Sequence, residues 1–263
     1  MSDSYPFLEH GGVLAFAHRG GTFAGLENSM AAFEHAVSLG YQYLETDVHA
    51  TSDGVLVAFH DDTLDRTTDS TGRIAEMPWS EVSQARIGGS EPIPRFVELL
   101  DAWPDVRINV DVKEDTAVEP FLDLLRGRTA DLERLCVAAF ADSRLHRVRA
   151  ALGPRLCTSM GRIEAARLRV AACGEPLSPL APHGVPCVQV PVRYGPLPVV
   201  TSDFVRAAHA RGVQVHVWTV NTRPEMERLL DLGVDGLISD EIETLRAVLS
   251  ERGVWVPRAV EGT

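Results

Sequence analysis

The sequence predicts an α/β fold and, within that class, a TIM (β/α)8 barrel. Short apolar runs alternate with helix-like segments, as they do in the βαβ units that build a parallel sheet. Eight such units fit into 263 residues, a length that barrels of this kind commonly reach in one domain. We therefore expect a single domain over residues 1–263. A doubly wound open sheet is the alternative, but no glycine-rich fingerprint after the first strand supports it.

The predicted strands are short apolar runs, and a segment with helical spacing follows each of them. In chain order the strands cover residues 13–17, 41–47, 107–112, 135–140, 156–159, 185–190, 213–220 and 236–239. The helices cover residues 27–39, 95–103, 117–126, 143–152, 162–172, 203–211, 224–232 and 241–251. The first helix ends at Gly40, a residue type that favours the end of a helix.

Three stretches depart from this alternation. Residues 55–59 form an extra apolar run after the second strand, joined to it by the turn Ser52-Asp53-Gly54. Residues 61–91 are polar and predict an excursion outside the core. The Pro-rich stretch 176–198 predicts loops around the single buried strand 185–190.

Charge and hydropathy exclude several classes of partner. The chain carries 25 Lys and Arg against 37 Asp and Glu, a net charge of −12. This balance argues against a nucleic-acid partner or an anionic membrane surface, which would need a basic face. A small anionic substrate stays possible, because a metal ion can reverse the charge of one pocket. The longest apolar run, 135–141, is far shorter than the roughly 20 residues of a membrane span.

The cysteines and the N-terminal residues indicate a reducing compartment. None of the four cysteines forms a C-x-x-C pair, which favours single core thiols over disulfides or a zinc site. They are Cys136, Cys157, Cys173 and Cys187. Residues 1–12 lack the basic and apolar regions of a secretion signal, so we expect a cytoplasmic protein.

Charged side chains collect at the ends of the predicted strands, where TIM barrels place their chemistry. His18 follows the first strand. Glu45 and Asp47 end the second strand, and their spacing of two residues puts both carboxylates on one face. Asp111 and Lys113 share a face at the end of the third strand. We therefore expect these groups to meet in one site.

The residue types in this site point to phosphoryl transfer on an anionic ester. Carboxylates without a neighbouring cysteine or paired histidine suit a hard cation, Mg²⁺ or Ca²⁺. His18 and His60, on different loops, suit general acid and base catalysis near neutral pH. Arg19 and Lys113 suit contacts with a phosphate.

These residues belong to a longer series of pieces that resembles the glycerophosphodiester phosphodiesterase family. The resemblance spans nearly the whole chain and is most specific in residues 17–72. The matching pieces are His18-Arg19-Gly20, Glu27-Asn28-Ser29, Glu45-Thr46-Asp47-Val48, Thr51-Ser52-Asp53-Gly54, His60-Asp61, Leu64-Asp65-Arg66-Thr67-Thr68, Gly72, Asn109-Val110-Asp111-Val112-Lys113, Val217-Trp218-Thr219-Val220-Asn221 and Gly233-Val234-Asp235-Gly236.

The resemblance implies a TIM barrel with a small insertion after the second strand, at residues 61–91. It implies that His18 and His60 are the catalytic pair and that Glu45 and Asp47 are metal ligands. The third ligand of the family is usually a Glu. This chain has the shorter Asp111 there, which affects metal choice and affinity more than the reaction. Glu114 is a less favoured substitute, because its parity places it off the face of Asp111.

Three further residues have both a structural and a functional interpretation. Asn28 either caps the first helix or contacts the site. Trp218 either packs in the barrel or forms a wall for the substrate. Asp61 either orients His60 or begins a turn. For Asn28 and Trp218 we favour the substrate contact, as we do for Arg19 and Lys113.

The expected reaction is metal-dependent hydrolysis of a glycerophosphodiester to glycerol 3-phosphate and an alcohol such as choline, a step in lipid and glycerol metabolism. The sequence leaves open the preferred alcohol, the oligomeric state, the roles of the two histidines, and whether water or the glycerol 2-hydroxyl is the nucleophile. The alternatives are a phosphodiesterase acting on lysophospholipids, a non-catalytic binding module and, least favoured, a metal-dependent aldolase.

Overall fold

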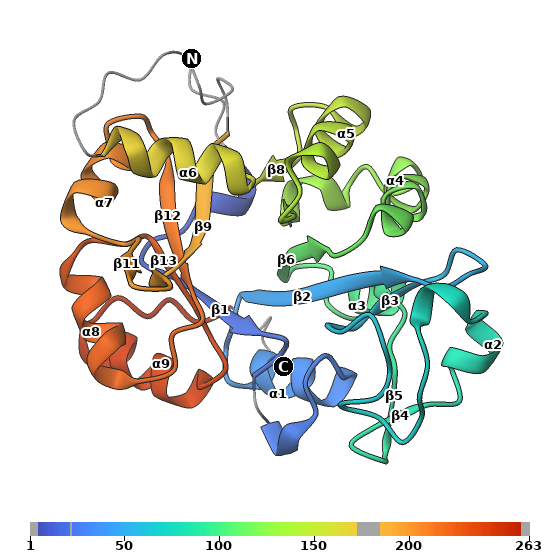
Figure 1. Ribbon diagram of the computed structural model, residues 1–263. Helices are drawn as coiled ribbons and strands as arrows, with labels where there is room; N and C mark the ends of the chain where they lie inside the picture. The colour runs from blue at the N-terminus through green and yellow to red at the C-terminus, as the bar shows by residue number, and fades with distance from the viewer. Residues whose placement is uncertain (1–4, 22, 173–184, 259–263) are drawn as a thin grey trace.

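Eight parallel strands form a closed barrel in the computed structural model, which describes residues 5–21, 23–172 and 185–258 (Figure 1). The strands are β1 Leu14–His18, β2 Tyr43–Ala50, β6 Arg107–Val112, β7 Leu135–Ala138, β8 Cys157–Thr158, β9 Cys187–Pro191, β12 Gln214–Trp218 and β13 Gly236–Ser239. They neighbour one another in the order β8-β7-β6-β2-β1-β13-β12-β9. A parallel bridge between Ser159 and Cys187 joins the two ends of this order. The predicted TIM barrel is therefore confirmed.

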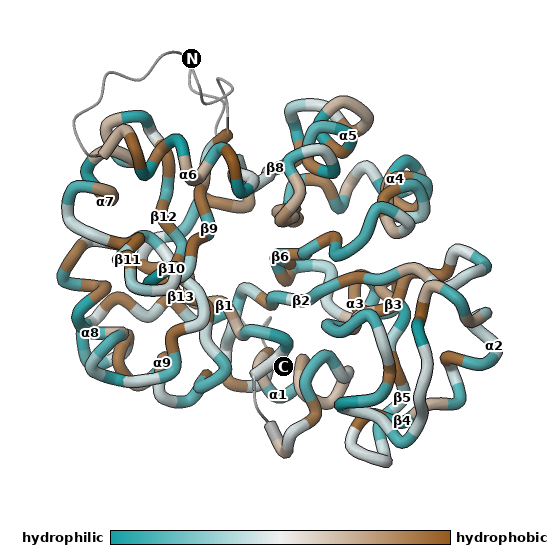
Figure 2. Tube along the Cα trace, in the orientation of Figure 1, coloured by the Kyte–Doolittle hydropathy of each residue, from teal (hydrophilic) through white to brown (hydrophobic). Residues whose placement is uncertain are grey.

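Helices surround the barrel, because each has one apolar face to bury against the strands (Figure 1). In α4, for example, Val118, Phe121, Leu122 and Leu125 recur at helical spacing and all are buried. The strands that they cover are largely hydrophobic, as β6 and β9 show in Figure 2. The helices are α1 Met30–Ser38, α3 Phe96–Ala102, α4 Val118–Arg126, α5 Asp142–Leu152, α6 Arg162–Ala171, α7 Ser202–His209, α8 Arg223–Asp231 and α9 Ile242–Glu251.

The first helix begins later than the predicted residue 27. Its N-cap is Ser29, whose hydroxyl accepts a hydrogen bond from the Ala32 amide at 3.1 Å. Asn28 has a φ of 58°, a left-handed conformation that no helix can include. The prediction that α1 starts at residue 27 is wrong for this reason. The two preceding residues, Glu27 and Asn28, are left free to take part in the site.

A short helical turn, Pro6–Leu8, packs against the side chains inside the barrel. Phe7 is fully buried, and its ring meets the Tyr43 ring edge-on at 5.4 Å between centroids. The Tyr43 hydroxyl donates a hydrogen bond to the Phe7 carbonyl at 2.9 Å. Phe7 and Tyr43 belong to one apolar cluster with Leu14, Phe16 and Ile238, which fill the interior. The barrel therefore has a packed centre.

The polar stretch 61–91 lies beside the barrel, next to β3 Leu56–Ala58, which pairs antiparallel with β2 (Figure 1). It lies outside the barrel core, as predicted, but its apolar side chains form a small cluster with residues just before and after it. The cluster forms because scattered single apolar residues converge here, which no apolar run reveals. Its buried members are Val57, Phe59, Leu64, Ile74, Val82, Ala85, Ile87 and Ile93. Its small elements are the turn Ile74–Glu76, α2 Trp79–Val82, β4 Arg86–Ile87 and β5 Glu91–Pro92.

The remaining short elements lie in loops. They are the turns Phe23–Gly25, Asp115–Ala117 and Asp131–Arg134 and the hairpin of β10 Arg193–Tyr194 with β11 Leu197–Pro198. That hairpin and β9 agree with the predicted loops around one strand. Residues 176–184 of the Pro-rich stretch lie outside the described residues.

Three of the cysteines are buried and free, which confirms the predicted core thiols over disulfides, but these thiols are close to one another. Cys136, Cys157 and Cys187 come together inside the barrel, because strands that are neighbours in space bring them to one place. Cys173 lies outside the described residues.

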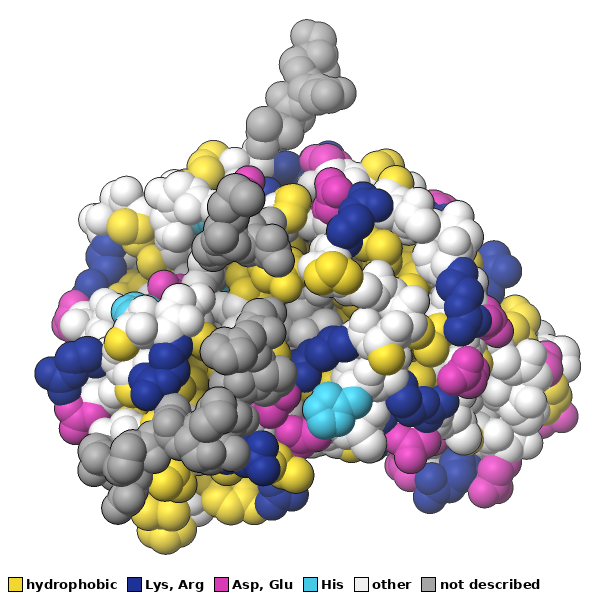
Figure 3. Space-filling model, turned by 90° about the horizontal axis from the view of Figure 1, so that it is seen from above, with side chains coloured by type: hydrophobic (Ala, Val, Ile, Leu, Met, Phe, Trp, Pro, Cys, Tyr) yellow, Lys and Arg dark blue, Asp and Glu magenta, His cyan; other side chains and the backbone are white. Residues whose placement is uncertain are grey.

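Across the part of the chain that the structure covers, no helix has both the length and the hydropathy needed to cross a membrane. Figure 3 shows Lys and Arg side chains interspersed with Asp and Glu on the face that it draws.

Candidate active site

Predicted site residues from three neighbouring strands meet at the carboxyl ends of those strands. In the register of the sheet, His18 of β1 pairs with Glu45 of β2. Asp47 of β2 pairs with Asp111 of β6. Alternate residues of a strand share a face, so the three carboxylates project into the same end of the barrel.

The three carboxylates are buried with two cations beside them. Glu45, Asp47 and Asp111 are 6%, 2% and 8% exposed. The Lys113 ammonium lies 2.8 Å from Asp47 Oδ1 and 3.2 Å from Asp111 Oδ2, and the Arg19 guanidinium Nε lies 3.5 Å from Asp47 Oδ2. Asp111 Oδ1 is buried and has no hydrogen-bond partner among the described residues. Such an oxygen is a candidate ligand for a cation.

Burial and neighbouring charges act differently on these carboxyls. Burial, helped by the charge of Asp47, raises the pKa of Glu45 to about 7. Burial also raises the pKa of Asp111. Burial opposes ionisation of Asp47 too, but Lys113 and Arg19 outweigh it and lower the pKa of Asp47. The positive charges of Lys113 and Arg19 thus do not fully compensate the three buried carboxyl groups.

His18 is held by carboxylates on two sides. Its Nδ1 lies 2.6 Å from Oδ1 of Asp240, the residue that follows β13. Its Nε2 lies 3.8 Å from Glu45 Oε2. Burial disfavours the charged ring, but Glu45 and Asp240 outweigh burial and raise the pKa of His18.

His60 faces the same carboxylates from the loop after β3. Its Nδ1 lies 2.5 Å from Asp61 Oδ1, so Asp61 orients His60, the functional alternative left open above. Burial lowers the pKa of His60, and Asp47 and Asp61 offset this only in part. The two histidines therefore have pKa values shifted in opposite directions.

A chain of ion pairs joins the two sides of the site. Arg19 Nη1 donates to Glu27 Oε1 at 2.9 Å. Arg66 contacts both Glu27 oxygens, at 2.9 and 2.7 Å, and both Asp61 oxygens, at 2.6 and 3.0 Å. These hydrogen bonds from Arg66 lower the pKa of Asp61 to about 2, so Asp61 stays ionised beside His60.

Asn28 contacts the site and is not a helix cap. Its Nδ2 donates to Asp47 Oδ2 at 3.3 Å, and its Oδ1 accepts from the Thr46 hydroxyl at 2.7 Å. Trp218, at the end of β12, is half-buried and meets the Phe140 ring edge-on at 5.9 Å between centroids. Phe140 is 57% exposed, so the pair forms an accessible aromatic surface.

Glu114 contacts a histidine outside the predicted catalytic pair. Its Oε1 is 3.5 Å from His49 Nδ1, and the opposite ring nitrogen of His49 contacts the His60 carbonyl at 3.0 Å. Through His49, Glu114 is thus linked to the loop that carries His60.

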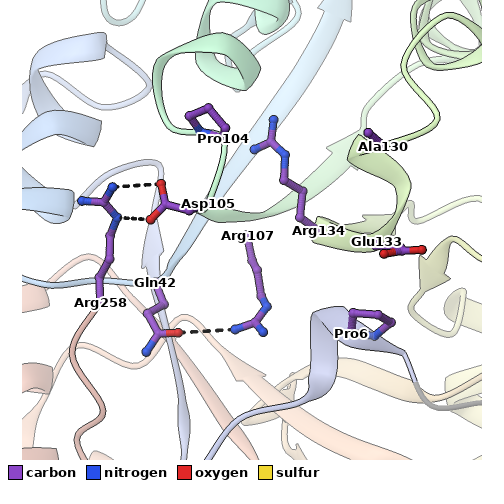
Figure 4. Close-up of a pocket in the computed structure, with 9 residues that line it drawn as sticks. All are labelled: Pro6, Gln42, Pro104, Asp105, Arg107, Ala130, Glu133, Arg134 and Arg258. Atoms are coloured by element: carbon purple, nitrogen blue, oxygen red, sulfur yellow. Dashed lines mark hydrogen bonds and ion pairs between the residues drawn. The ribbon is translucent and has the colours of Figure 1, made fainter. Parts of the chain in front are cut away.

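A cavity of about 440 Å³ lies at the other end of the barrel, among residues that precede or begin strands (Figure 4). Arg107, the first residue of β6, reaches Gln42 there at 3.4 Å, and Arg258 contacts both oxygens of Asp105 at 2.6 and 2.8 Å. None of the predicted catalytic or metal-binding residues lines this cavity. We therefore place the chemistry at the strand ends, where the titratable groups meet.

Sequence reasoning missed three participants. Asp240 was not predicted as a site residue, although it directly follows the predicted strand 236–239. Glu27 and Arg66 were recognised only as parts of the resemblance, because their mutual contacts depend on how the insertion folds against β1.

Known proteins are similar to this chain over most of its length. Residues 18–244 match the glycerophosphoryl diester phosphodiesterase family. A probable glycerophosphodiester phosphodiesterase 2 of Mycobacterium tuberculosis is 40% identical over 255 residues, 95% of either chain. A human lysophospholipase D is 28% identical over 89% of this chain and 85% of its own.

Two solved structures are similar in fold. A putative glycerophosphoryl diester phosphodiesterase from Silicibacter pomeroyi has a TM-score of 0.78 at 23% identity, over 96% of this chain and all of that one. A phosphodiesterase from Oleispira antarctica, solved with the product sn-glycerol-3-phosphate, has a TM-score of 0.73 at 22% identity, over 94% and 98% of the two chains.

Proposed function

Because the chain belongs to the glycerophosphoryl diester phosphodiesterase family, we propose that it hydrolyses glycerophosphodiesters to glycerol 3-phosphate and an alcohol, with a divalent cation and two histidines. One observation carries the catalytic part of the proposal. His18 and His60 lie on either side of one group of buried carboxylates. Each also has an aspartate of its own on Nδ1, Asp240 at 2.6 Å for His18 and Asp61 at 2.5 Å for His60. This is the arrangement that an acid and a base on either side of one phosphate require.

The carboxylates suit a hard cation. Oxygen ligands are those that Mg²⁺ and Ca²⁺ prefer, and Asp111 Oδ1 is buried without a hydrogen-bond partner among the described residues. Burial, together with the charge of Asp47, raises the pKa of Glu45 to about 7, and a bound cation would offset both effects. Glu45, Asp47 and Asp111 would hold it. When bound, the cation supplies Lewis-acid polarisation of the phosphate.

The cationic side chains bind and orient the phosphate. Lys113 and Arg19 lie beside Asp47, so they can exchange part of this contact for a phosphoryl oxygen. Asn28 holds Asp47 from behind, and Glu27 holds Arg19. Positioning by such contacts lowers the barrier because the reacting atoms no longer have to be brought together.

The opposite pKa shifts divide the roles of the histidines. The pKa of His18 is raised, so this ring is the better proton donor to the leaving alkoxide. The pKa of His60 is lowered by burial, so it is the better acceptor of a proton from the nucleophile. Asp240 and Asp61 each contact Nδ1 of a ring, which leaves Nε2 of each histidine for the proton transfer.

A leaving-group experiment tests this assignment. His18→Ala should lower kcat on glycerophosphocholine by about 10²–10⁴, the usual contribution of an acid or base. On a glycerophosphodiester of p-nitrophenol, whose anion leaves without a proton, the same variant should lose much less. His60→Ala should lose rate on both substrates. Equal losses by His18→Ala on both substrates would reject the role of His18 as acid, and no hydrolysis by the folded wild type with Mg²⁺ or Ca²⁺ would reject the function.

Lysophospholipids are the second candidate substrates. The exposed ring of Phe140 against Trp218 offers apolar surface beside the strand ends, where an acyl chain could rest. A human relative is named as a lysophospholipase D. Parallel assays on glycerophosphocholine and lysophosphatidylcholine decide between them, and Phe140→Ser should weaken only the second activity.

A further inference from the structure

Three thiols that the proposed chemistry does not use lie together inside the barrel. Cys136 of β7 pairs in register with Cys157 of β8, and Cys187 of β9 follows across the bridge that closes the barrel. Their sulfur atoms all lie within 4.8 Å of one another, and Cys136 Sγ is 3.9 Å from Cys187 Sγ. Each cysteine is at most 1% exposed.

This thiol triad lies below the phosphodiesterase site. Cys136 is the register partner of Asn109, whereas Asp111 pairs with Ala138, two residues further along each strand. At about 3.3 Å per residue, the triad is one layer, roughly 6–7 Å, deeper in the barrel. Its apolar surroundings include Phe7 and Phe16. The triad is therefore separate from the carboxylates.

The spacing of the sulfurs matches a metal coordination triangle. Metal–thiolate bonds of about 2.3 Å in a trigonal plane put the sulfurs about 4.0 Å apart. The edge from Cys136 Sγ to Cys187 Sγ, 3.9 Å, matches this spacing, and the other two edges are at most 4.8 Å. Among the described residues, this is the group of three ligand atoms found within 4.8 Å of one another.

We propose that Cys136, Cys157 and Cys187 form a site for a soft divalent cation of the zinc group, bound by three thiolates. Thiolate ligands select soft metals over Mg²⁺ and Ca²⁺, so the two sites take different ions. Binding breaks three S–H bonds, forms three metal–sulfur bonds and releases three protons to solvent, without electron transfer. The bound unit has one net negative charge.

The surroundings of the triad can support that charge. Burial raises the pKa of Cys136 and of Cys157, whereas hydrogen bonds from these two thiols lower the pKa of Cys187. The charges of His216 and Arg149 also lower the pKa of Cys187. Arg149 approaches from α5, where its Nε donates to the Thr158 hydroxyl at 2.9 Å. Existing contacts therefore favour one thiolate, at Cys187, and the bound cation would have to stabilise the other two.

A Cd²⁺ titration of the reduced full-length protein tests the site. Excess Mg²⁺ is present throughout to occupy the carboxylates. We expect a thiolate-to-Cd²⁺ charge-transfer band in the ultraviolet that saturates at one ion per chain, and a rise in Tm with Cd²⁺. Absence of a saturable one-to-one band in the folded wild type overturns the proposal and leaves the triad as ordinary packing of small apolar side chains.

Matched variants locate the ion. Cys136→Ser, Cys157→Ser and Cys187→Ser should each weaken Cd²⁺ binding by more than about 100-fold, since even loss of an outer contact costs 10–100-fold. Cys173→Ser is the control and should bind as the wild type does. A band lost only in Cys173→Ser would also overturn the proposal. Hydrolysis with Mg²⁺ is measured in parallel and should survive in the serine variants. Failure of the thiol site is therefore distinguishable from failure of the phosphodiesterase function.

Discussion

Replacing Asp240 by Asn should slow hydrolysis and alter one limb of the pH profile. Asp240 Oδ1 contacts His18 Nδ1 at 2.6 Å, and Asp240 Oδ2 accepts from Asn221 Nδ2 at 2.7 Å. The Asn221 donor will hold the oxygen of the new amide, so the amide NH₂ will point at His18. That group cannot accept the Nδ1 proton, and the substitution therefore removes a charge and favours the wrong tautomer of His18.

The size of the effect follows from this contact. A hydrogen bond to a charged group contributes about 1.5–3 kcal/mol. At about 1.4 kcal/mol for each factor of ten, its loss lowers kcat/KM by about 10- to 150-fold. A full reversal of the tautomer increases the loss to as much as about 10⁴, as for a triad aspartate in serine proteases.

The pH profile identifies the mechanism of the loss. Asp240 and Glu45 raise the pKa of His18 against the effect of burial, so removal of one charge lowers that pKa. His18 must be protonated to act as an acid. The alkaline limb of kcat/KM, where it loses this proton, should therefore move to lower pH. Stopped assays on glycerophosphocholine over the pH range in which the protein stays folded provide the measurement.

Asp61→Asn is the matched control on the other histidine. Asp61 raises the pKa of His60, and its replacement should lower that pKa and move the acidic limb, where His60 must be neutral. An Asp240→Asn enzyme with wild-type rate and limbs would refute the reasoning. So would a shift confined to the acidic limb, which would exchange the roles of the two histidines.

Three further outcomes can be measured. EDTA should abolish hydrolysis, and Mg²⁺ or Ca²⁺ should restore it; activity that persists after dialysis against EDTA would contradict the cation site. Phe7→Ala should lower the free energy of unfolding in urea by about 3–5 kcal/mol, because the ring is fully buried beneath the barrel; a change below 1 kcal/mol would contradict that packing. Gly20→Ala should lower the free energy of unfolding by about 1–3 kcal/mol more than Gly54→Ala. Both glycines have a positive φ, but an added Cβ would lie 2.8 Å from the Ala32 backbone at Gly20 and would meet nothing within 4 Å at Gly54. Equal losses would show that φ, not contact, sets the cost.

The positions of His18, Glu45, Asp47, Asp111 and Lys113 could be predicted because they depend on local rules. Alternation along a strand determines which side chains share a face, and parallel strands end at one edge of the barrel. These rules need no knowledge of which strands are neighbours. The tertiary contacts then placed the side chains within reach of one another, as expected.

The features that were missed depend on closure of the barrel. His18 and Asp240 are 222 positions apart, and nothing near either residue indicates the other. The thiol triad likewise requires β7, β8 and β9 to be neighbours with a particular stagger. The start of α1 was misplaced for a local reason. Asn28 has a left-handed backbone conformation, so the helix begins after it and Ser29 is the N-cap.

The pairing of the first strand with the last links activity to completion of synthesis. β1 lies between β2 and β13, so one of its two edges stays open until the C-terminal strand has emerged from the ribosome. His18 is made early, but its carboxylate partner is made 222 residues later. A nascent or truncated chain that stops before Asp240 lacks both the neighbouring strand and the group that orients its acid. Hydrolysis of phosphodiesters should therefore begin only when translation of the barrel is complete. Fragments that end before Asp240 should be inactive.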